Sequence, residues 1–106
     1  MDEKSLALDF EVKGANLCRF LIDEKNEKLF SKKLFDTICL FTEYCVSLNS
    51  NALSKNEIAL IRKNASIESE KITLHLNALY ISGFISEAQK DSMIKTLDVL
   101  KKEINI

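Results

Sequence analysis

Two side chains that could move a proton or bind a metal, His75 and Glu68, lie in the same predicted helix. His75 is the single histidine of the chain. Residues spaced by four and then three positions share one side of a helix, so Glu68, Ile72 and His75 form one column. One histidine and one carboxylate supply at most half of a metal site, and no Glu-x-x-His motif accompanies them. We therefore predict a packing or interface histidine with a polar partner; a ligand or catalytic role is the alternative.

The three cysteines, Cys18, Cys39 and Cys45, offer thiols for redox or metal chemistry. Cys39 and Cys45 are too far out of phase on a helix to point in the same direction. An odd number of cysteines without a Cys-x-x-Cys pair fits a reducing compartment. The chain opens with a polar, acidic stretch over residues 1–4 rather than with a signal peptide. We expect the cysteines to fill the core and the protein to be cytoplasmic.

Short pairs of basic residues could contact phosphate, but acidic residues lie close to each pair. The pairs are Lys32-Lys33, Arg62-Lys63 and Lys101-Lys102. The net charge is −1 and the sequence pI is about 5.8, so the broad basic face of a general nucleic-acid binder is not visible. No glycine-rich phosphate loop, Ser-His-Asp set or carboxylate pair is recognisable. We predict no catalytic residues, no cofactor and no metal, and solvated helix faces for the basic pairs.

The composition favours long helices in one domain over residues 1–106. The chain is 46% hydrophobic and 29% charged, and it has two glycines and no proline. Turn-rich β-sandwiches and disulfide scaffolds need glycine and proline, whereas long helices do without them. No apolar run approaches the ~20 residues that a membrane-spanning helix requires.

Apolar residues at helical spacing predict four helices joined by short connections. The helices span about residues 5–23, 29–48 and 54–82, and the last begins near 86. Short connections force consecutive helices to lie antiparallel. The predicted fold is therefore all-α, an up-down-up-down antiparallel four-helix bundle. Within its first helix, Gly14 predicts a close approach by a neighbouring helix.

Three residues at helix boundaries are predicted to act as caps. Ser54 is followed three residues later by Glu57, and Ser86 by Gln89, which is the capping-box pattern at a helix start. Gly83 can adopt the left-handed conformation that closes a helix without a Cβ penalty.

The second predicted helix carries apolar side chains on most of its sides. A helix on the surface of a monomeric bundle keeps one side for solvent. We therefore predict that this helix contributes to an interface between copies of the chain. The predicted interface residues are Phe35, Leu40, Tyr44, Val46 and His75.

Four stretches resemble a bacterial four-helix-bundle family whose founding members are encoded in intervening sequences of large-subunit ribosomal RNA genes. The stretches are CRFL at 18–21, LFSKKL at 29–34, SKNEI at 54–58 and GFISE at 83–87. The last is close to the Gly-Tyr-Ile-(Ser/Thr)-Glu turn of that family. Asp36-Thr37 stand where the second helix of the family carries Arg-Ser, so the chain resembles a divergent member.

The resemblance implies a small cytoplasmic bacterial protein without known catalysis that forms a closed homo-oligomeric ring, often a pentamer. We therefore predict a non-enzymatic scaffold or interaction protein that binds itself and a protein partner. A related branch of the family is basic, binds RNA and assists reverse transcriptases in diversity-generating retroelements. An accessory role to such a nucleic-acid enzyme is the alternative, although the charge of this chain argues against binding nucleic acid.

Overall fold

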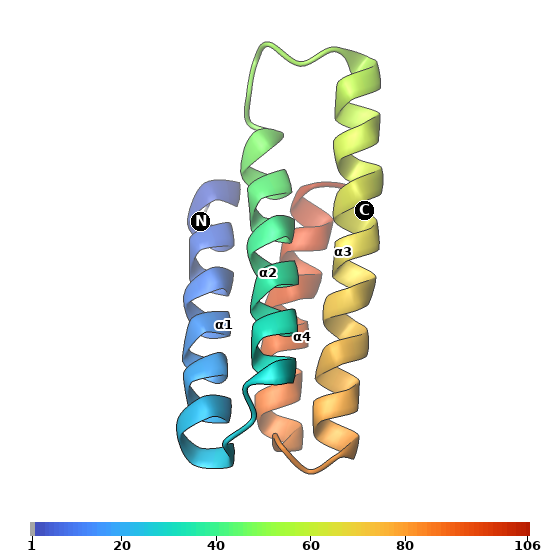
Figure 1. Cartoon of the computed structure of the whole chain (residues 1–106). Coiled ribbons are helices and arrows are strands. Elements are labelled where there is room, and N and C mark those ends of the chain that lie inside the picture. Colours follow the sequence, from blue (N-terminus) through green and yellow to red (C-terminus); the bar gives the residue numbers. More distant parts are fainter. Residues whose placement is uncertain (1) are drawn as a thin grey trace.

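The computed structural model describes residues 2–106, and these residues form four helices. They are α1 (Glu3–Lys25), α2 (Leu29–Ser47), α3 (Lys55–Ile81) and α4 (Glu87–Glu103). Consecutive helices run antiparallel, as Figure 1 shows. The predicted all-α, up-down-up-down four-helix bundle is thus confirmed. The first helix begins two residues earlier than the sequence pattern indicated, because Asp2 caps it by accepting a hydrogen bond from the backbone N–H of Ser5.

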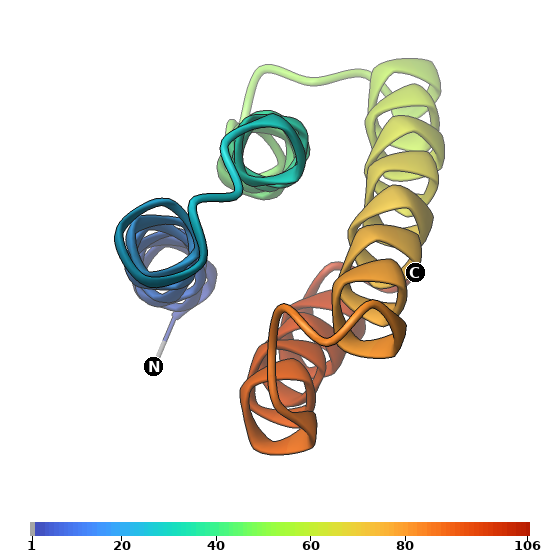
Figure 2. The same cartoon turned by 60° about the horizontal axis from the view of Figure 1, so that its bottom comes forward.

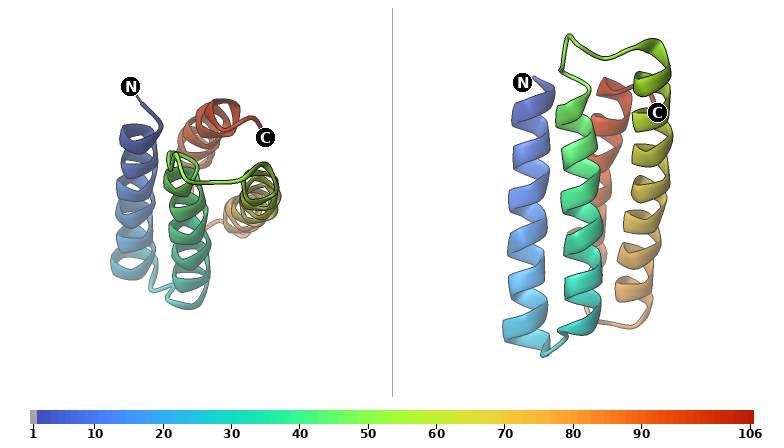
Figure 3. Two further views of the ribbon diagram at one scale, coloured as in Figure 1. Left: turned by 90° about the horizontal axis from the view of Figure 1, so that it is seen from above. Right: turned by 45° about the horizontal axis from the view of Figure 1, so that its top comes forward.

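The helices occupy the corners of an elongated bundle that measures 44 × 24 × 18 Å. α1 packs against α2 and α4, and α3 also packs against α2 and α4. α1 and α3 therefore stand at opposite corners, which Figure 3 shows from above. α3 is the longest helix, with 27 residues, and its first turns extend beyond the neighbouring end of α4 (Figure 1).

Each helix contributes one buried edge to a common core. Phe10 of α1 and Phe41 of α2 meet edge to face, with their ring centroids 6.0 Å apart. Both rings are fully buried. Other side chains with almost no exposed surface are Leu21, Leu34, Ile38, Cys45, Ile72, Leu76, Leu79, Leu97 and Leu100.

Gly14 lets α1 and α2 approach one another closely, as its place in the sequence predicted. A Cβ atom at Gly14 would lie 2.8 Å from Cδ1 and 3.2 Å from Cγ2 of Ile38. Ile38 is fully buried and has little room to move. Any larger residue at position 14 would therefore displace α1 from α2 or force Ile38 out of its rotamer.

Capping boxes begin both helices of the second half. The hydroxyl of Ser54 accepts from the N–H of Glu57, whose carboxylate accepts from the N–H of Ser54. The same reciprocal pair joins Ser86 and Gln89 at the start of α4. These bonds satisfy backbone N–H groups that have no partner within the helix.

The turn between α3 and α4 depends on the backbone of Gly83, which has a φ of +80°. The N–H of Phe84 donates to the carbonyl of Leu79, and the N–H of Gly83 donates to that of Tyr80. This pair of bonds is the Schellman arrangement that ends a helix. Ile85 is buried immediately after it, so the turn also seals that end of the core.

Replacement of Gly83 by alanine should lower the free energy of unfolding by about 1 kcal/mol, because a Cβ atom disfavours a positive φ. No atom lies within 4 Å of the position that this Cβ would occupy, so the loss reports backbone conformation and not a clash. Gly83→Asn is the matched control, since asparagine tolerates the left-handed conformation and should lose less. Urea denaturation of both variants measures the difference. Equal stability of Gly83→Ala and the parent would contradict this account of the turn.

Candidate functional site

Four apolar side chains of α2 were predicted to lie at an interface. The bundle partly buries two of them and leaves the other two exposed. Phe35 and Tyr44 are half-buried and pack against the core. Leu40 and Val46 remain more exposed, each at 37%. The outward side of α2 between them carries the exposed polar residues Lys32, Asp36, Glu43 and Ser47.

The four predicted interface residues of α2 lie on two different flanks of that helix, and His75 lies on α3. With 3.6 residues per turn, Leu40 is rotated by about 140° from Phe35 around the helix axis. Phe35 lines a hollow shared with α1, and Val46 lines another on the same side. Leu40 and His75 line a hollow between α2 and α3. The structure therefore brings Leu40 together with His75, and Phe35 together with α1, but it does not form one patch from all five.

The flank of α2 that borders α1 belongs to a wider apolar surface, which we name the α1–α2 face. On α1 its residues recur at spacings of four, three and seven, so they follow one line along the helix. The face consists of Leu8, Val12, Ala15 and Ile22 from α1, and Phe35, Cys39 and Val46 from α2. Leu8 is 63% exposed and Val12 is 50% exposed. Figure 2 shows α1 and α2 side by side.

The contribution of α1 to this face was not predicted from the sequence. The inward line of α1 includes Phe10 and Leu17, and both residues are buried. A second line over Leu8, Val12 and Ile22 was present in the spacing. It was not recognised because a helix with two apolar lines shows little contrast between an apolar side and a polar side.

Short polar contacts hold α1 and α2 in place beneath the face. The hydroxyl of Thr42 lies 2.8 Å from Oε1 of Glu11. The hydroxyl of Ser31 donates to the carbonyl of Cys18, whose thiol in turn lies 3.5 Å from the carbonyl of Ser31. These pairs satisfy groups that burial would otherwise leave without hydrogen bonds.

Cys39 is a neutral thiol at the edge of the α1–α2 face. Burial, together with the nearby carboxylate of Glu11, raises its pKa to about 11. A thiol reacts as its thiolate, so Cys39 is a poor nucleophile at neutral pH. Burial also raises the pKa of Cys18.

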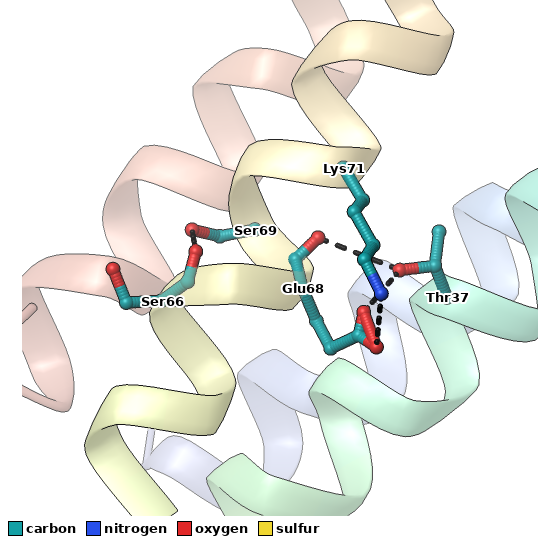
Figure 4. Close-up of polar contacts among 5 residues, drawn as sticks. All are labelled: Thr37, Ser66, Glu68, Ser69 and Lys71. Atoms are coloured by element: carbon teal, nitrogen blue, oxygen red, sulfur yellow. Dashed lines mark hydrogen bonds and ion pairs between the residues drawn. The ribbon is translucent and has the colours of Figure 1, made fainter.

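The flank of α2 that borders α3 contains a polar cluster around Glu68, which Figure 4 shows in close-up. The hydroxyl of Thr37 donates to Oε2 of Glu68 over 2.9 Å, and Nζ of Lys71 lies 3.5 Å from Oε1. The side chain of Glu68 is 10% exposed, whereas that of Lys71 is 55% exposed. A buried carboxylate needs such partners, because transfer of an unpaired charge from water is costly.

His75 shares the hollow of this cluster with Lys33, Thr37 and Glu68. Burial lowers the pKa of His75, and the positive charges of Lys33 and Lys71 lower it further. The imidazole is therefore neutral at pH 7. The spacing in the sequence predicted that Glu68 and His75 share one column of α3. The structure adds that both oxygens of Glu68 already have partners on Thr37 and Lys71.

Two further observations bear on the class of site. Among residues 2–106, the side chains of His, Cys, Asp and Glu that the structure describes form no group of three or more that could hold a metal ion. None of the described helices has the length and apolarity needed to cross a membrane.

Comparison of the chain with protein-family models, with curated proteins and with solved structures finds no match. Membership of the intervening-sequence family therefore stays a prediction from the sequence.

Replacement of Lys33 by glutamine should raise the pKa of His75, because removal of a neighbouring positive charge favours the imidazolium. NMR titration measures this directly, since the chain has one histidine. Lys32→Gln, on the exposed side of the same helix, is the matched control and should leave the titration unchanged. A pKa of His75 at or above 6.5 in the parent protein would contradict the geometry described here.

The direction of the same shift predicts how stability depends on pH. The pKa of His75 is lower in the folded chain than its ordinary value of 6.5, so the unfolded chain binds this proton more readily. Stability contributed by the neutral imidazole is present above about pH 6.5 and is lost as the pH falls through and below that value. His75→Gln should therefore weaken the pH dependence of the melting temperature below pH 6.5 relative to the parent.

Replacement of Thr37 by valine should lower the free energy of unfolding by about 1–3 kcal/mol, because it leaves one oxygen of the buried Glu68 without its donor. Thr73→Val removes a hydroxyl of α3 that donates to the carbonyl of Ser69 within the same helix, and it should cost less. Chemical denaturation of the two variants compares the effects. Equal losses would show that the bond between Thr37 and Glu68 has no special role.

Proposed function

We propose that this chain is a self-assembling scaffold or interaction protein without catalytic activity of its own, and that the α1–α2 face is its assembly surface. The observation that carries the proposal is the exposure of Leu8 and Val12 on the outer line of α1, at 63% and 50%. Ile22, at 41%, continues the same line toward the far end of the helix.

The energetics support this use of the face. Burial of one such side chain contributes about 1.5–3 kcal/mol, and the apolar line from Leu8 to Ile22 runs for about 21 Å. Apolar surfaces of this extent on soluble proteins usually serve as interaction sites. A closed assembly covers the face on every copy, whereas an open head-to-tail contact would produce fibres.

The charges around the face suit a second copy of the same chain. The hollow near the start of α1 is bordered by Asp2, Glu11 and Glu43 together with one base, Lys4. The hollow near its end is bordered by the opposite set, with three bases and one acid: Arg19, Lys28, Lys32 and Asp23. Each end of the face can therefore meet the opposite charge on another copy, which favours correct registration of the contact. The resemblance noted in the sequence implies a ring of five; the number of copies is part of the proposal.

Light scattering after size exclusion should give a mass well above the 12.1 kDa of one chain. Val12→Glu should shift the particle toward the monomer with its helicity retained, because Val12 already contacts water in the single chain. Val99→Glu on α4 is the matched control: Val99 is 41% exposed but lies outside the face, so the mass should not change. A mass near 12.1 kDa for the parent at tens of micromolar would overturn the proposal.

A further inference from the structure

The charges of the α1–α2 face restrict which surface can cover it. The start of α1 and the end of α2 lie at the same end of the bundle, as Figure 1 shows. The hollow at this end is lined by three acids and one base, which gives a net charge of −2. The hollow at the opposite end is lined by three bases and one acid, which gives a net charge of +2. A partner surface must therefore be basic against the first hollow, acidic against the second and apolar between them.

The α1–α2 face itself has this pattern when it is turned end for end. Two copies can meet face to face about either of two two-fold axes in the plane of contact. An axis parallel to the helices keeps each end at its own level, so the two acidic hollows would meet, and so would the two basic hollows. An axis perpendicular to the helices reverses the ends, so the acidic hollow of each copy meets the basic hollow of the other. Like charges in contact oppose association, so the charges favour the perpendicular axis.

The perpendicular axis lays α1 antiparallel against α1 of the second copy. Leu8 and Ile22 each lie seven residues from Ala15, so an axis at the level of Ala15 places Leu8 against Ile22 of the partner subunit. Seven residues extend for about 10 Å along a helix and fall only about 20° short of two full turns, so both side chains stay close to the line of Ala15. Ala15 is exposed and has the smallest side chain on this line, so the two helices can approach closely where they cross.

The same axis meets α2 at the level of Asp36. Phe10 of α1 contacts Phe41 of α2. Because the two helices run antiparallel, a step of five residues forward along α1 corresponds to a step of five residues back along α2. Ala15 is therefore level with about Asp36.

The charged residues of α2 then meet their opposites on α2 of the second copy. Lys32 and Lys28 lie four and eight residues from Asp36 toward one end, and Glu43 lies seven residues from it toward the other. Reversal of the ends places Glu43 between the levels of Lys28 and Lys32 of the partner subunit, and this happens twice in each pair of copies. All three of these side chains are exposed in the single chain and can meet across the contact.

We infer that the α1–α2 face binds the same face of a second copy, turned end for end about a two-fold axis at the level of Ala15. The inference rests on the proposed function, since it uses the assembly surface named there, and it adds which surface of the partner that face meets. The contact is isologous, so one pair of copies covers the face on both. The face therefore joins chains in pairs, and a ring of five would need other surfaces as well.

Cysteine cross-linking tests the orientation of the two copies. In a Cys39→Ala background, which removes the partly exposed thiol, co-expressed Leu8→Cys and Ile22→Cys chains should form an intermolecular disulfide under mild oxidation. A disulfide requires Cα atoms within about 7 Å of each other. Leu8→Cys alone should not cross-link, because its two thiols would lie about 21 Å apart across the axis.

The parallel axis predicts a different cross-link. It would place Leu8 against the end of α2 that carries Val46, since both residues line the hollow at the acidic end. A disulfide between Leu8→Cys and Val46→Cys chains, with none between Leu8→Cys and Ile22→Cys chains, would overturn the inference. An assembled protein that forms neither disulfide would overturn it as well.

Reversal of one charge tests the contact between the ends. Glu43→Lys places a third base against Lys28 and Lys32 of the partner subunit, twice in each pair, so the dissociation constant should rise by roughly tenfold. Light scattering over a range of concentrations measures this constant. Glu43→Lys/Lys32→Glu exchanges two of the charges and should recover affinity.

Glu70→Lys is the matched control for this reversal. It makes the same charge change at an exposed site on α3, outside the face, and should leave the dissociation constant as in the parent. Equal affinity of Glu43→Lys and the parent would contradict the pairing of the ends.

The two proposals fail in different ways. A parent protein that is monomeric overturns both. A parent that assembles and responds to Val12→Glu, but that lacks the disulfide between Leu8→Cys and Ile22→Cys chains, overturns the end-for-end contact and leaves the α1–α2 face as the assembly surface.

Discussion

The spacing between α1 and α2 depends on the missing side chain at Gly14. Two methyl groups of Ile38 lie 2.8 and 3.2 Å from the position where a Cβ atom would stand. The two helices can therefore lie close enough for Phe10 to reach Phe41 in the core and for Thr42 to reach Glu11 near the surface. The α1–α2 face is built from the same two helices, so its shape follows from this one contact. A residue with a Cβ atom at position 14 would displace α1 from α2, and so change the shape of the face, or force Ile38 out of its rotamer.

On the flank of α2 that borders α3, a polar contact fixes the position of the two helices. Close packing at Gly14 has that role on the flank that borders α1. The bond from Thr37 to Glu68 joins α2 to α3, and it fixes which turns of the two helices lie opposite each other. Apolar residues alone tolerate small shifts along a helix, whereas a buried carboxylate has few acceptable positions. Arg62 likewise ties α3 to α4 by a polar contact, because its Nε donates to the carbonyl of Ile104 at the end of α4.

Much of the fold could be predicted from the sequence, because each helix carries its own signals. Ser54, Gly83 and Ser86 mark boundaries through local hydrogen bonds and backbone conformation, which neighbouring helices hardly alter. The placement of the interface residues was harder. Spacing shows that Phe35 and Leu40 lie on different sides of one helix, but it does not show which neighbour covers each side. The hydrogen bond from Thr37 to Glu68 likewise joins residues far apart in the sequence, and no local sequence pattern predicts it.

The contact between α1 and α4 has a consequence for the folding of the chain. In the part of the chain that the structure describes, the other main contacts join consecutive helices, whereas Lys13 of α1 reaches Thr96 of α4 over 83 residues of sequence. Contacts between sequence neighbours close small loops and form quickly, and distant contacts form more slowly. The contact between α1 and α4 should therefore form last and open first under native conditions. Amide hydrogen exchange would then report opening at α1 and α4 before the loss of α2, which packs against both of its neighbours in sequence.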